Sequence, residues 1–424
     1  MKNKAIILGA GPSGLVTAWK LLENDWEVQI YEKLLIPGGM CRSWEWNNHI
    51  VDTGPHIFHT DNASLKDIWL KEFSDLLIED NFWCQNVKGK NFDQFWDYPL
   101  SWESISNYPK EVKKKILDEL KSLSPEKSAR AKSFSEYILS LVGPTIYEMF
   151  FKKYPAKIWG INGNDMTAEW APRRIDIRQK NLPFYHGQFS AVGKYGTGKI
   201  YERLKEKIIK LGGKIYFGET IIKINSDGKK INSFETLKGK KIDINFNDVC
   251  ISTIPITLTA KLLGLETNLK FRGIRSIYLK YKVKEILPGK NHWLYFDSED
   301  LLFNRITETK KMSKSICPEN ETFLTAEVTF SSGDKVDSMK DGEIEETIKD
   351  QLLKIGLTKN CEFLESSSNK ENFVYPVQTK GYNEELSKIK SFINKFDQLY
   401  SIGTGGEFSY ADSQILFLKA FDLV

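Results

Sequence analysis

The stretch Ala5-Ile-Ile-Leu-Gly-Ala-Gly-Pro-Ser-Gly14 decides the fold of this 424-residue chain. Four apolar residues predict a short buried strand, and a GxGxxG turn follows it at once. Residues 15–22 then predict a helix, residues 26–31 predict a second strand, and Glu32 ends that strand. This order of strand, glycine turn, helix, strand and acidic residue is typical of a dinucleotide-binding βαβ unit. We therefore predict a Rossmann-like domain at the start of the chain.

Each residue of this turn has an expected role at a bound dinucleotide. Gly9 permits the tight turn, Gly11 lets a pyrophosphate approach the backbone, and Gly14 lets helix and strand pack closely. The N–H groups at the start of the helix face the anion. Glu32 is expected to accept hydrogen bonds from an adenosine ribose. The other expected cofactor contacts in this unit are Pro12, Ser13 and Lys33.

A second glycine pair distinguishes between the possible dinucleotides. Gly38-Gly39 and Arg42 come directly after the second strand, where many flavoproteins place a glycine pair and a cationic side chain near the FAD pyrophosphate. A guanidinium can contact a phosphate through two hydrogen bonds. The alternative for Arg42 is a surface arginine on a turn. We predict non-covalent FAD, because no histidine or cysteine attachment motif accompanies the glycine turns.

Later segments are expected to complete the FAD-binding domain. Residues 214–224 predict one strand, residues 248–255 predict a buried strand that ends at a proline turn, and residues 400–406 predict a strand that runs into a glycine turn. A helix from about Ala411 would direct its positive end at the flavin ring. The domain is therefore expected to be discontinuous. Its expected segments are residues 1–99, 191–267 and 379–424.

The segments between them predict a different architecture. Residues 100–190 predict mainly helices, over 109–123 and 133–154, because apolar residues recur at three- and four-residue spacing. Residues 268–378 contain alternating segments that are typical of an antiparallel sheet, with a polar loop at 365–372. The expected fold class is α/β (α+β overall), a Rossmann-like FAD-binding domain with a helical insertion and an antiparallel-sheet substrate domain.

The bulk composition limits the classes of partner. The net charge is only +4 and is spread along the chain, so neither nucleic acid nor a membrane surface is indicated. The five cysteines form no CxxC pair, which indicates neither a metal site nor a disulfide framework and favours a cytoplasmic setting. No apolar run reaches the roughly 18 residues that a membrane span needs.

Eight short motifs follow one another along nearly the whole chain. They are His56-Ile-Phe-His-Thr60, Tyr98-Pro-Leu100, Ser140-Leu-Val-Gly143, Tyr154-Pro-Ala-Lys-Ile-Trp-Gly160, Arg174-Ile-Asp-Ile-Arg178, Asn304-Arg-Ile306, Tyr375-Pro-Val377 and Tyr410-Ala-Asp412. Together they resemble the motifs of the UDP-galactopyranose mutase family, which belongs to the protoporphyrinogen-oxidase-like flavoproteins. The resemblance implies a flavin-dependent mutase that interconverts the pyranose and furanose forms of a UDP-sugar. It also implies a covalent adduct between N5 of reduced flavin and the sugar.

The same resemblance assigns roles at the substrate. Arg178 and Arg305 would clamp its pyrophosphate, since planar guanidinium groups match phosphate oxygens better than lysine does; a surface salt bridge is the alternative for either. Phe150 and Tyr154 would sandwich uracil, and Trp159 would lie over the substrate on a mobile loop. The alternative for these aromatic residues is a single apolar helix face. The remaining residues implied at the substrate are Arg174, Tyr185, Tyr375, Tyr410 and Asp412.

Residues near the flavin are implied in the same way. A histidine of the first motif, His56 or His59, would lie against the isoalloxazine ring, and the alternative is a hydrogen-bonded core histidine. Where bacterial mutases carry an arginine in a GRLG motif, this chain has Thr404, and Phe408 and Ala411 also differ from the family pattern. These departures leave the identity of the sugar open. The C-terminal residues implied at the cofactor are Gly403, Tyr410, Asp412 and Ser413.

Two other functions stay open. An FAD-dependent oxidase or desaturase of the protoporphyrinogen-oxidase or amine-oxidase type shares the fold and needs no paired arginines. A flavoprotein that binds nucleotide sugars without isomerising them, as a partner subunit, would keep Tyr154 and the arginines. For the mutase, the expected reductant of FAD is NAD(P)H or another cellular donor, and the expected oligomer, where the chain associates, is a homodimer.

Overall fold

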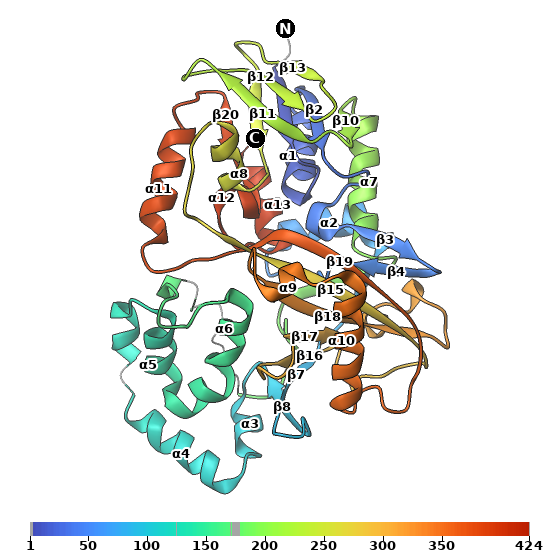
Figure 1. Ribbon diagram of the computed structural model, residues 1–424, viewed down its shortest axis with the longest axis vertical. Coiled ribbons are helices and arrows are strands. Elements are labelled where there is room, and N and C mark those ends of the chain that lie inside the picture. The colour runs from blue at the N-terminus through green and yellow to red at the C-terminus, as the bar shows by residue number, and fades with distance from the viewer. Residues whose placement is uncertain (1–2, 124, 170, 172–178, 424) are drawn as a thin grey trace. The chain divides into compact units, whose positions relative to one another are not determined.

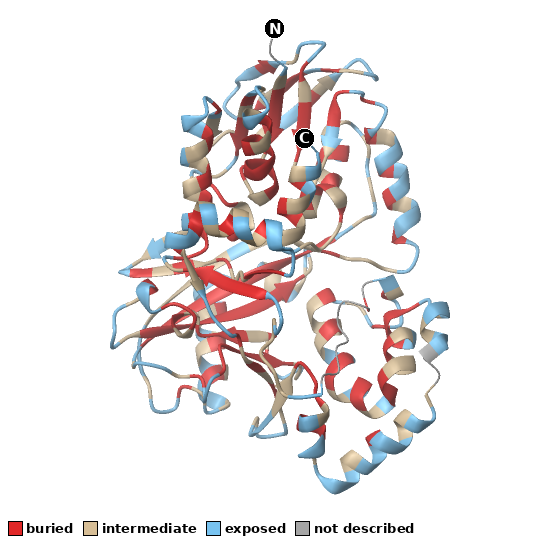
Figure 2. Ribbon diagram, turned by 180° about the vertical axis from the view of Figure 1, so that it is seen from behind, coloured by how far each residue is buried: buried red, intermediate tan, exposed pale blue. Residues whose placement is uncertain are grey.

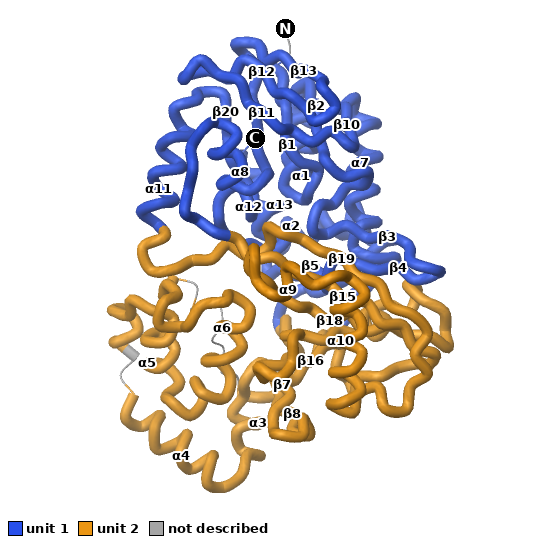
Figure 3. The backbone as a smooth tube through the Cα atoms, viewed as in Figure 1, with its two compact units in different colours: residues 1–80, 187–270, 383–424 blue, residues 81–186, 271–382 orange. Residues whose placement is uncertain are grey.

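The computed structural model describes residues 3–123, 125–169, 171 and 179–423, and it divides into two compact units (Figure 3). Unit 1 comprises Met1–Asp80, Gly187–Lys270 and Asn383–Val424. Unit 2 comprises Asn81–His186 and Phe271–Tyr382.

Unit 1 contains a parallel five-stranded sheet in the order β10-β2-β1-β14-β20 (Figure 1). Its strands are β1 (Lys4–Leu8), β2 (Glu27–Glu32), β10 (Lys214–Phe217), β14 (Val249–Ser252) and β20 (Leu399–Ser401). All three segments of unit 1 contribute strands, so this sheet is discontinuous in the sequence. The strands predicted at residues 5–8 and 26–31 are confirmed.

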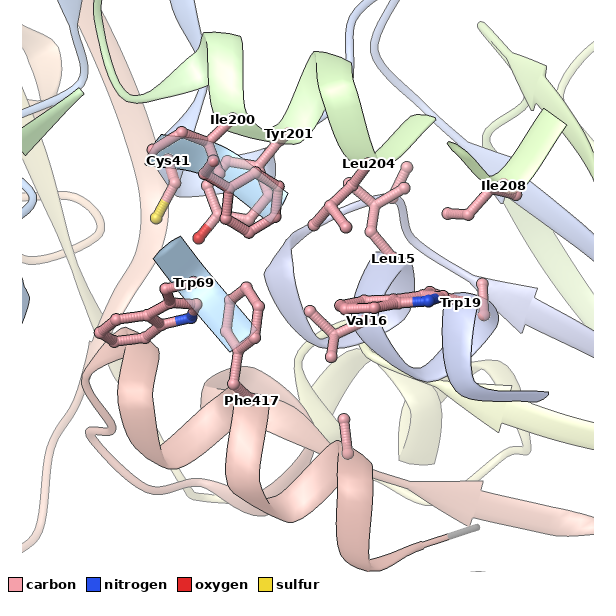
Figure 4. Close-up of a cluster of buried hydrophobic side chains, with 14 of the residues drawn as sticks. Leu15, Val16, Trp19, Cys41, Trp69, Ile200, Tyr201, Leu204, Ile208 and Phe417 are labelled. Atoms are coloured by element: carbon pink, nitrogen blue, oxygen red, sulfur yellow. The ribbon is translucent and has the colours of Figure 1, made fainter. Parts of the chain in front are cut away.

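Helices of unit 1 bury a common apolar core. The helices that contribute to it are α1 (Pro12–Glu23), α2 (Ala63–Phe73), α7 (Gly198–Lys210) and α13 (Ser413–Asp422). Along α7, Ile200, Leu204 and Ile208 recur every four residues and are fully buried (Figure 4), as expected for one helix face. Phe417 of α13 meets Trp69 of α2 edge to face at a centroid distance of 5.6 Å. Each such side chain contributes roughly 1.5–3 kcal/mol by burial.

Smaller elements complete unit 1. They are the hairpin β3 (Ser43–Trp46) and β4 (His49–Asp52), the sheet β5 (Phe58–Thr60), β9 (Phe189–Gly193) and β6 (Leu77–Glu79), the sheet β11 (Ile221–Ser226), β12 (Ile231–Thr236) and β13 (Lys241–Asp243), and the helices η1 (Gly39–Cys41), η2 (Ser74–Leu76), α8 (Ile256–Leu262), α11 (Tyr382–Ile393) and α12 (Gly403–Glu407). The single strand predicted at 214–224 is wrong. Gly218 adopts a φ of +69°, and the chain turns there from β10 into β11, which belongs to another sheet.

Unit 2 is built on a seven-stranded sheet in the order β19-β15-β18-β17-β16-β7-β8. Its strands are β7 (Cys84–Lys88), β8 (Gln94–Tyr98), β15 (Phe271–Lys282), β16 (Trp293–Phe296), β17 (Arg305–Thr307), β18 (Thr322–Phe330) and β19 (Glu362–Pro376). All neighbours are antiparallel except β16 and β7. The inner strand β18 is buried along its whole length, and buried strands dominate the middle of this sheet (Figure 2).

The boundaries of unit 2 differ from those expected. Residues 84–98 form β7, which pairs with β16, and β8, which pairs with β7. The first segment of unit 1 therefore ends at Asp80 and not at residue 99. The helical and sheet segments also belong to one compact unit. The loop predicted at 365–372 is wrong, because these residues lie within β19. That strand is at the edge of the sheet, where one side is not covered by a neighbouring strand and polar residues are tolerated.

The helices of unit 2 are α3 (Trp102–Ser106), α4 (Lys110–Lys121), η3 (Pro125–Arg130), α5 (Phe134–Ile146), the π-helical η4 (Tyr147–Phe151), α6 (Lys153–Trp159), η6 (Thr309–Lys311), η7 (Lys314–Ile316), α9 (Lys335–Ser338) and α10 (Asp341–Lys354). The helix predicted at 109–123 is confirmed as α4. The continuous helix predicted at 133–154 is wrong, since Gly143 has a φ of +77° before Pro144 and a π-helical segment follows. Among the described residues, no helix is long and apolar enough to cross a membrane.

Candidate functional site

The glycine turn between β1 and α1 contains two kinds of glycine. Gly9 has a φ of +105°, and a Cβ there would lie 2.4 Å from Oγ1 of Thr253. A Cβ on Gly14 would lie 2.1 Å from the carbonyl oxygen of Gly9, so only glycine lets α1 pack this closely. At Gly11 the nearest atom would be Cα of Gly39, at 3.9 Å, and the φ of −76° suits any residue. The fold therefore does not need glycine at position 11, and its missing side chain keeps open the space that a pyrophosphate would use.

The second glycine pair lies directly against this turn. The N–H of Gly38 donates to the carbonyl of Ala10 at 2.8 Å, and a Cβ on Gly39 would be 3.1 Å from Cα of Gly11. Arg42 is buried, and its Nη1 donates to the carbonyl of Gly39 at 2.9 Å. The alternative of a surface arginine is therefore excluded. The structure brings both glycine segments and this guanidinium to one place.

Glu32 is fixed at the carboxyl end of β2. Its Oε2 accepts from the N–H of Ala10, and its Oε1 accepts from the N–H of Leu34, each at 2.7 Å. Because each carboxylate oxygen can accept more than one hydrogen bond, both remain able to accept from a ribose hydroxyl. The helix α1 begins at Pro12, and its glycine N-cap offers no side-chain cap, which suits an anion-binding helix terminus. Lys33 is exposed beside this site.

The C-terminal glycine turn packs on the first one. Gly403 has a φ of +81°, and a Cβ there would lie 2.5 Å from Oγ of Ser13. Oγ1 of Thr404 donates to the carbonyl of Ala411 at 3.4 Å. The helix expected from about residue 411 is confirmed as α13. Ser413 is its first residue, Asp412 is its N-cap, and Tyr410 lies half-buried just before them.

His59 is held by side chains from distant parts of unit 1. Its Nδ1 lies 2.9 Å from Oε1 of Gln188, and its Nε2 lies 3.3 Å from Nε2 of Gln414. The carboxylate of Asp412 is 3.7 Å from the same Nε2. Because Oε1 of Gln188 accepts and Nε2 of Gln414 donates, neutral His59 carries its proton on Nδ1. His56 lies half-buried in the segment between β4 and β5.

In unit 2, strand pairing builds a site around Arg305. This residue begins β17 and lies opposite Tyr295 of β16 and Glu327 of β18. Its Nε and Nη2 each donate to a carboxylate oxygen of Glu327 at 2.8 Å. The Glu327 side chain is 2% exposed and that of Arg305 is 22% exposed. Burial raises the pKa of Glu327, and Arg305 opposes that shift. The pair thus fixes the orientation of the guanidinium. It uses only the edge formed by Nε and Nη2.

Aromatic side chains gather around this guanidinium. The ring of Tyr154, on α6, meets that of Tyr295 at 4.9 Å. The ring of Trp159 meets that of Tyr375 at 5.6 Å. Burial raises the pKa of the Tyr154 hydroxyl well above its usual range, while Arg305 opposes the rise. Arg305 and the hydroxyls of Tyr154 and Tyr375 therefore interact electrostatically.

The other predicted substrate residues are placed differently. Trp159 is buried and is the last residue of α6, which Gly160 ends with a φ of +66°, so it does not lie on a loop. Phe150 is buried in η4 with its ring 6.1 Å from that of Trp96. It therefore lies in a different helical segment from Tyr154. Tyr185 packs against Phe184 at 4.9 Å. Arg174 and Arg178 lie outside the described residues.

Comparisons with known proteins agree with this arrangement. A model of the NAD(P)-binding Rossmann-like domain matches residues 7–72. A probable UDP-galactopyranose mutase from Klebsiella pneumoniae is 28% identical over 217 residues, which are 49% of this chain and 54% of the relative. A dTDP-fucopyranose mutase from Escherichia coli is 28% identical over 213 residues, 48% of this chain and 54% of the relative. The chain therefore resembles the UDP-galactopyranose mutase family. The matched region spans about half the length of each of these two relatives.

The similarity in fold extends over the whole chain. The crystal structure of a reduced UDP-galactopyranose mutase has a TM-score of 0.82 and 22% identity, and the match covers 99% of this chain and 94% of that one. The Rossmann-like α/β fold class is thereby confirmed.

Four residues that contact the predicted site residues were not predicted from the sequence. Glu327 and Tyr295 flank Arg305 only through strand register, and no local motif marks them. Gln188 and Gln414 contact His59 across separations of 129 and 355 residues. Such contacts become visible only once the strands and helices are placed.

Proposed function

We propose that the protein is a flavin-dependent mutase that interconverts the pyranose and furanose forms of a UDP-sugar, with a UDP-galactose-like sugar as the expected substrate. The observation that carries the proposal is Arg305, a guanidinium held in one orientation by the buried Glu327 and surrounded by tyrosines. A planar guanidinium with a donor edge not used by this pair suits a diphosphate. An oxidase or desaturase of apolar substrates would have no use for this oriented charge.

Non-covalent FAD is the cofactor that fits unit 1. Gly11 and the start of α1 would hold the pyrophosphate, Arg42 would add positive charge beside it, and Glu32 would accept from the ribose. When bound and reduced, FAD supplies a nucleophile for the anomeric carbon of the sugar. We assign the reduction of FAD to NAD(P)H or another cellular donor, and the protein to the cytoplasm, where nucleotide sugars are available.

The residues of the chain itself would bind and orient the substrate. Arg305 would hold the pyrophosphate, together with Arg178 and Arg174, so that the departing UDP stays in place until it rejoins the sugar. Tyr154 would stack on uracil, since its ring is amphipathic and held by Tyr295. The hydroxyls of Tyr375, Tyr185 and Tyr410 would donate hydrogen bonds to the nucleotide sugar, and His59 would face the flavin.

UDP should quench the tryptophan fluorescence of the protein, and Trp159→Phe should lose most of that change. Trp159 is buried against Tyr375, so a nucleotide that binds beside Tyr154 and Tyr375 would alter its surroundings. Trp19→Phe is the control, because Trp19 is equally buried but lies in the apolar core of unit 1. A UDP titration of each variant, in both redox states, measures the effect. No response of the wild-type protein in either state would favour the oxidase.

A further inference from the structure

The ammonium group of Lys157 is held by the connection between β16 and β17. Its Nζ donates to the backbone carbonyls of Ser298, Leu301 and Phe303, at 2.8, 2.6 and 2.6 Å. A lysine ammonium has three N–H donors, and this arrangement uses all of them. The side chain therefore fastens α6 to residues 297–304.

The backbone carbonyl of Lys157 also accepts hydrogen bonds, from residues of two strands. The last carbonyls of a helix have no partner within it, and Lys157 lies near the end of α6. Its carbonyl oxygen accepts from Oγ1 of Thr329 at 2.9 Å and from Nη2 of Arg272 at 3.5 Å. Thr329 belongs to β18 and Arg272 to β15. Lys157 thus links one short helix to β15, to β18 and to the connection between β16 and β17.

The elements that Lys157 joins both carry residues assigned to the nucleotide. The helix α6 carries Tyr154, about one turn before Lys157, and Trp159 at its end. The connection at residues 297–304, which accepts the hydrogen bonds of Lys157, is followed directly by Arg305, the first residue of β17. The rings of Tyr154 and Tyr295 also meet between α6 and β16, and the ammonium adds directional hydrogen bonds to that contact.

We propose that Lys157 is a positioning residue that fixes Tyr154 relative to Arg305, so that one nucleoside diphosphate contacts both. The proposal rests on the proposed function, because it takes Tyr154 and Arg305 as ligands of the base and the diphosphate. Burial lowers the pKa of Lys157 to about 8, against the attraction of Asp297 and Glu299, so the group is still mostly charged at pH 7. Its three hydrogen bonds are therefore charge-assisted and stronger than neutral ones.

The chain provides a matched control for this lysine. Nζ of Lys310 also donates to three backbone carbonyls, those of Pro318, Glu319 and Glu321, and Lys310 is buried. These carbonyls belong to the connection between β17 and β18, which carries none of the residues assigned to the nucleotide. Loss of either ammonium should cost a similar number of hydrogen bonds, but only Lys157 should matter for the nucleotide.

The experiment compares Lys157→Met with Lys310→Met. We expect a similar loss of Tm in both and FAD content unchanged in both. The affinity for UDP should fall about tenfold to a hundredfold in Lys157→Met, which is about 1.4 to 2.8 kcal/mol, and should stay within about threefold of wild type in Lys310→Met. Hydrogen exchange of the amides at 298–303 should be faster in Lys157→Met alone.

Three results would overturn the positioning role: wild-type UDP affinity in Lys157→Met, an equal loss in Lys310→Met, or unchanged exchange at 298–303. If wild-type protein itself bound no UDP, the proposed function would fail and this role with it. Should Lys157→Met not fold, Lys157→Arg decides, because a guanidinium keeps the charge but cannot direct three bonds from one nitrogen. Its UDP affinity should fall about tenfold, which is about 1.4 kcal/mol, and wild-type affinity would contradict the proposal.

Discussion

Arg305→Ala should weaken the binding of a UDP-sugar by about thirtyfold to a few thousandfold and leave the flavin spectrum unchanged. Truncating one partner of a desolvated, hydrogen-bonded charge pair costs roughly 2–5 kcal/mol, and each 1.4 kcal/mol is about tenfold in affinity. Arg305→Lys should recover only part of the loss, since an ammonium cannot make the planar two-bond contacts that a guanidinium makes. Titration calorimetry with UDP, on reduced protein with its FAD content measured, gives the affinity.

The pairing of Arg305 with Glu327 requires a second variant. Arg305→Ala leaves a buried carboxylate without its guanidinium, which destabilises the fold whether or not the arginine binds a nucleotide. The double variant Arg305→Met with Glu327→Gln removes the buried charge and should recover much of the lost Tm, but it should not recover UDP binding. Losses below about fivefold in Arg305→Ala, near the roughly 1 kcal/mol of an exposed salt bridge, would remove Arg305 as a ligand of the diphosphate. So would full UDP affinity in the double variant.

Gly11→Val should give a folded protein that retains almost no FAD. A Cβ at this position meets only Cα of Gly39, at 3.9 Å, and the φ of Gly11 suits valine. The added methyl groups would instead occupy the space through which a pyrophosphate approaches the backbone. The ratio of flavin to protein absorbance after purification, with circular dichroism as the test of folding, measures this.

Two other glycines separate cofactor loss from misfolding. Gly342→Val is the control that should keep FAD, because nothing lies within 4 Å of a Cβ there. Gly14→Ala should damage the fold itself, since its Cβ would lie 2.1 Å from the carbonyl oxygen of Gly9. Stoichiometric FAD in purified Gly11→Val would mean that the nucleotide does not bind at this turn.

The parts of the fold that could be predicted depend on local sequence. The run from Ala5 to Glu32 predicted β1, α1 and β2 to within a few residues, because glycine geometry and apolar periodicity act over short distances. The prediction of a single helix at 133–154 was wrong because of the backbone conformation of one residue, which apolar periodicity does not show. Apolar spacing continues through Gly143, but its left-handed backbone ends the regular helix.

The rest of the site depends on contacts between distant residues. Arg305 could be singled out from its motif, yet its partner Glu327 follows only from the pairing of β17 with β18. Residues 84–98 belong to the sheet of unit 2 because β7 pairs in parallel with β16. No residue near β7 in the sequence indicates this pairing. The burial of Arg42 likewise depends on how its loop packs on the first glycine turn.

The most direct test of the proposed mutase activity is an incubation of purified, FAD-loaded protein with a panel of UDP- and dTDP-sugars, with and without dithionite, followed by NMR or chromatography of the sugar nucleotides. With dithionite-reduced protein, we predict that at least one UDP-sugar is converted between its pyranose and furanose forms, without net oxidation, and that oxidised protein gives no conversion. If reduced, FAD-loaded protein that binds UDP yields no ring isomer from any sugar of the panel, the protein is not a mutase of these substrates.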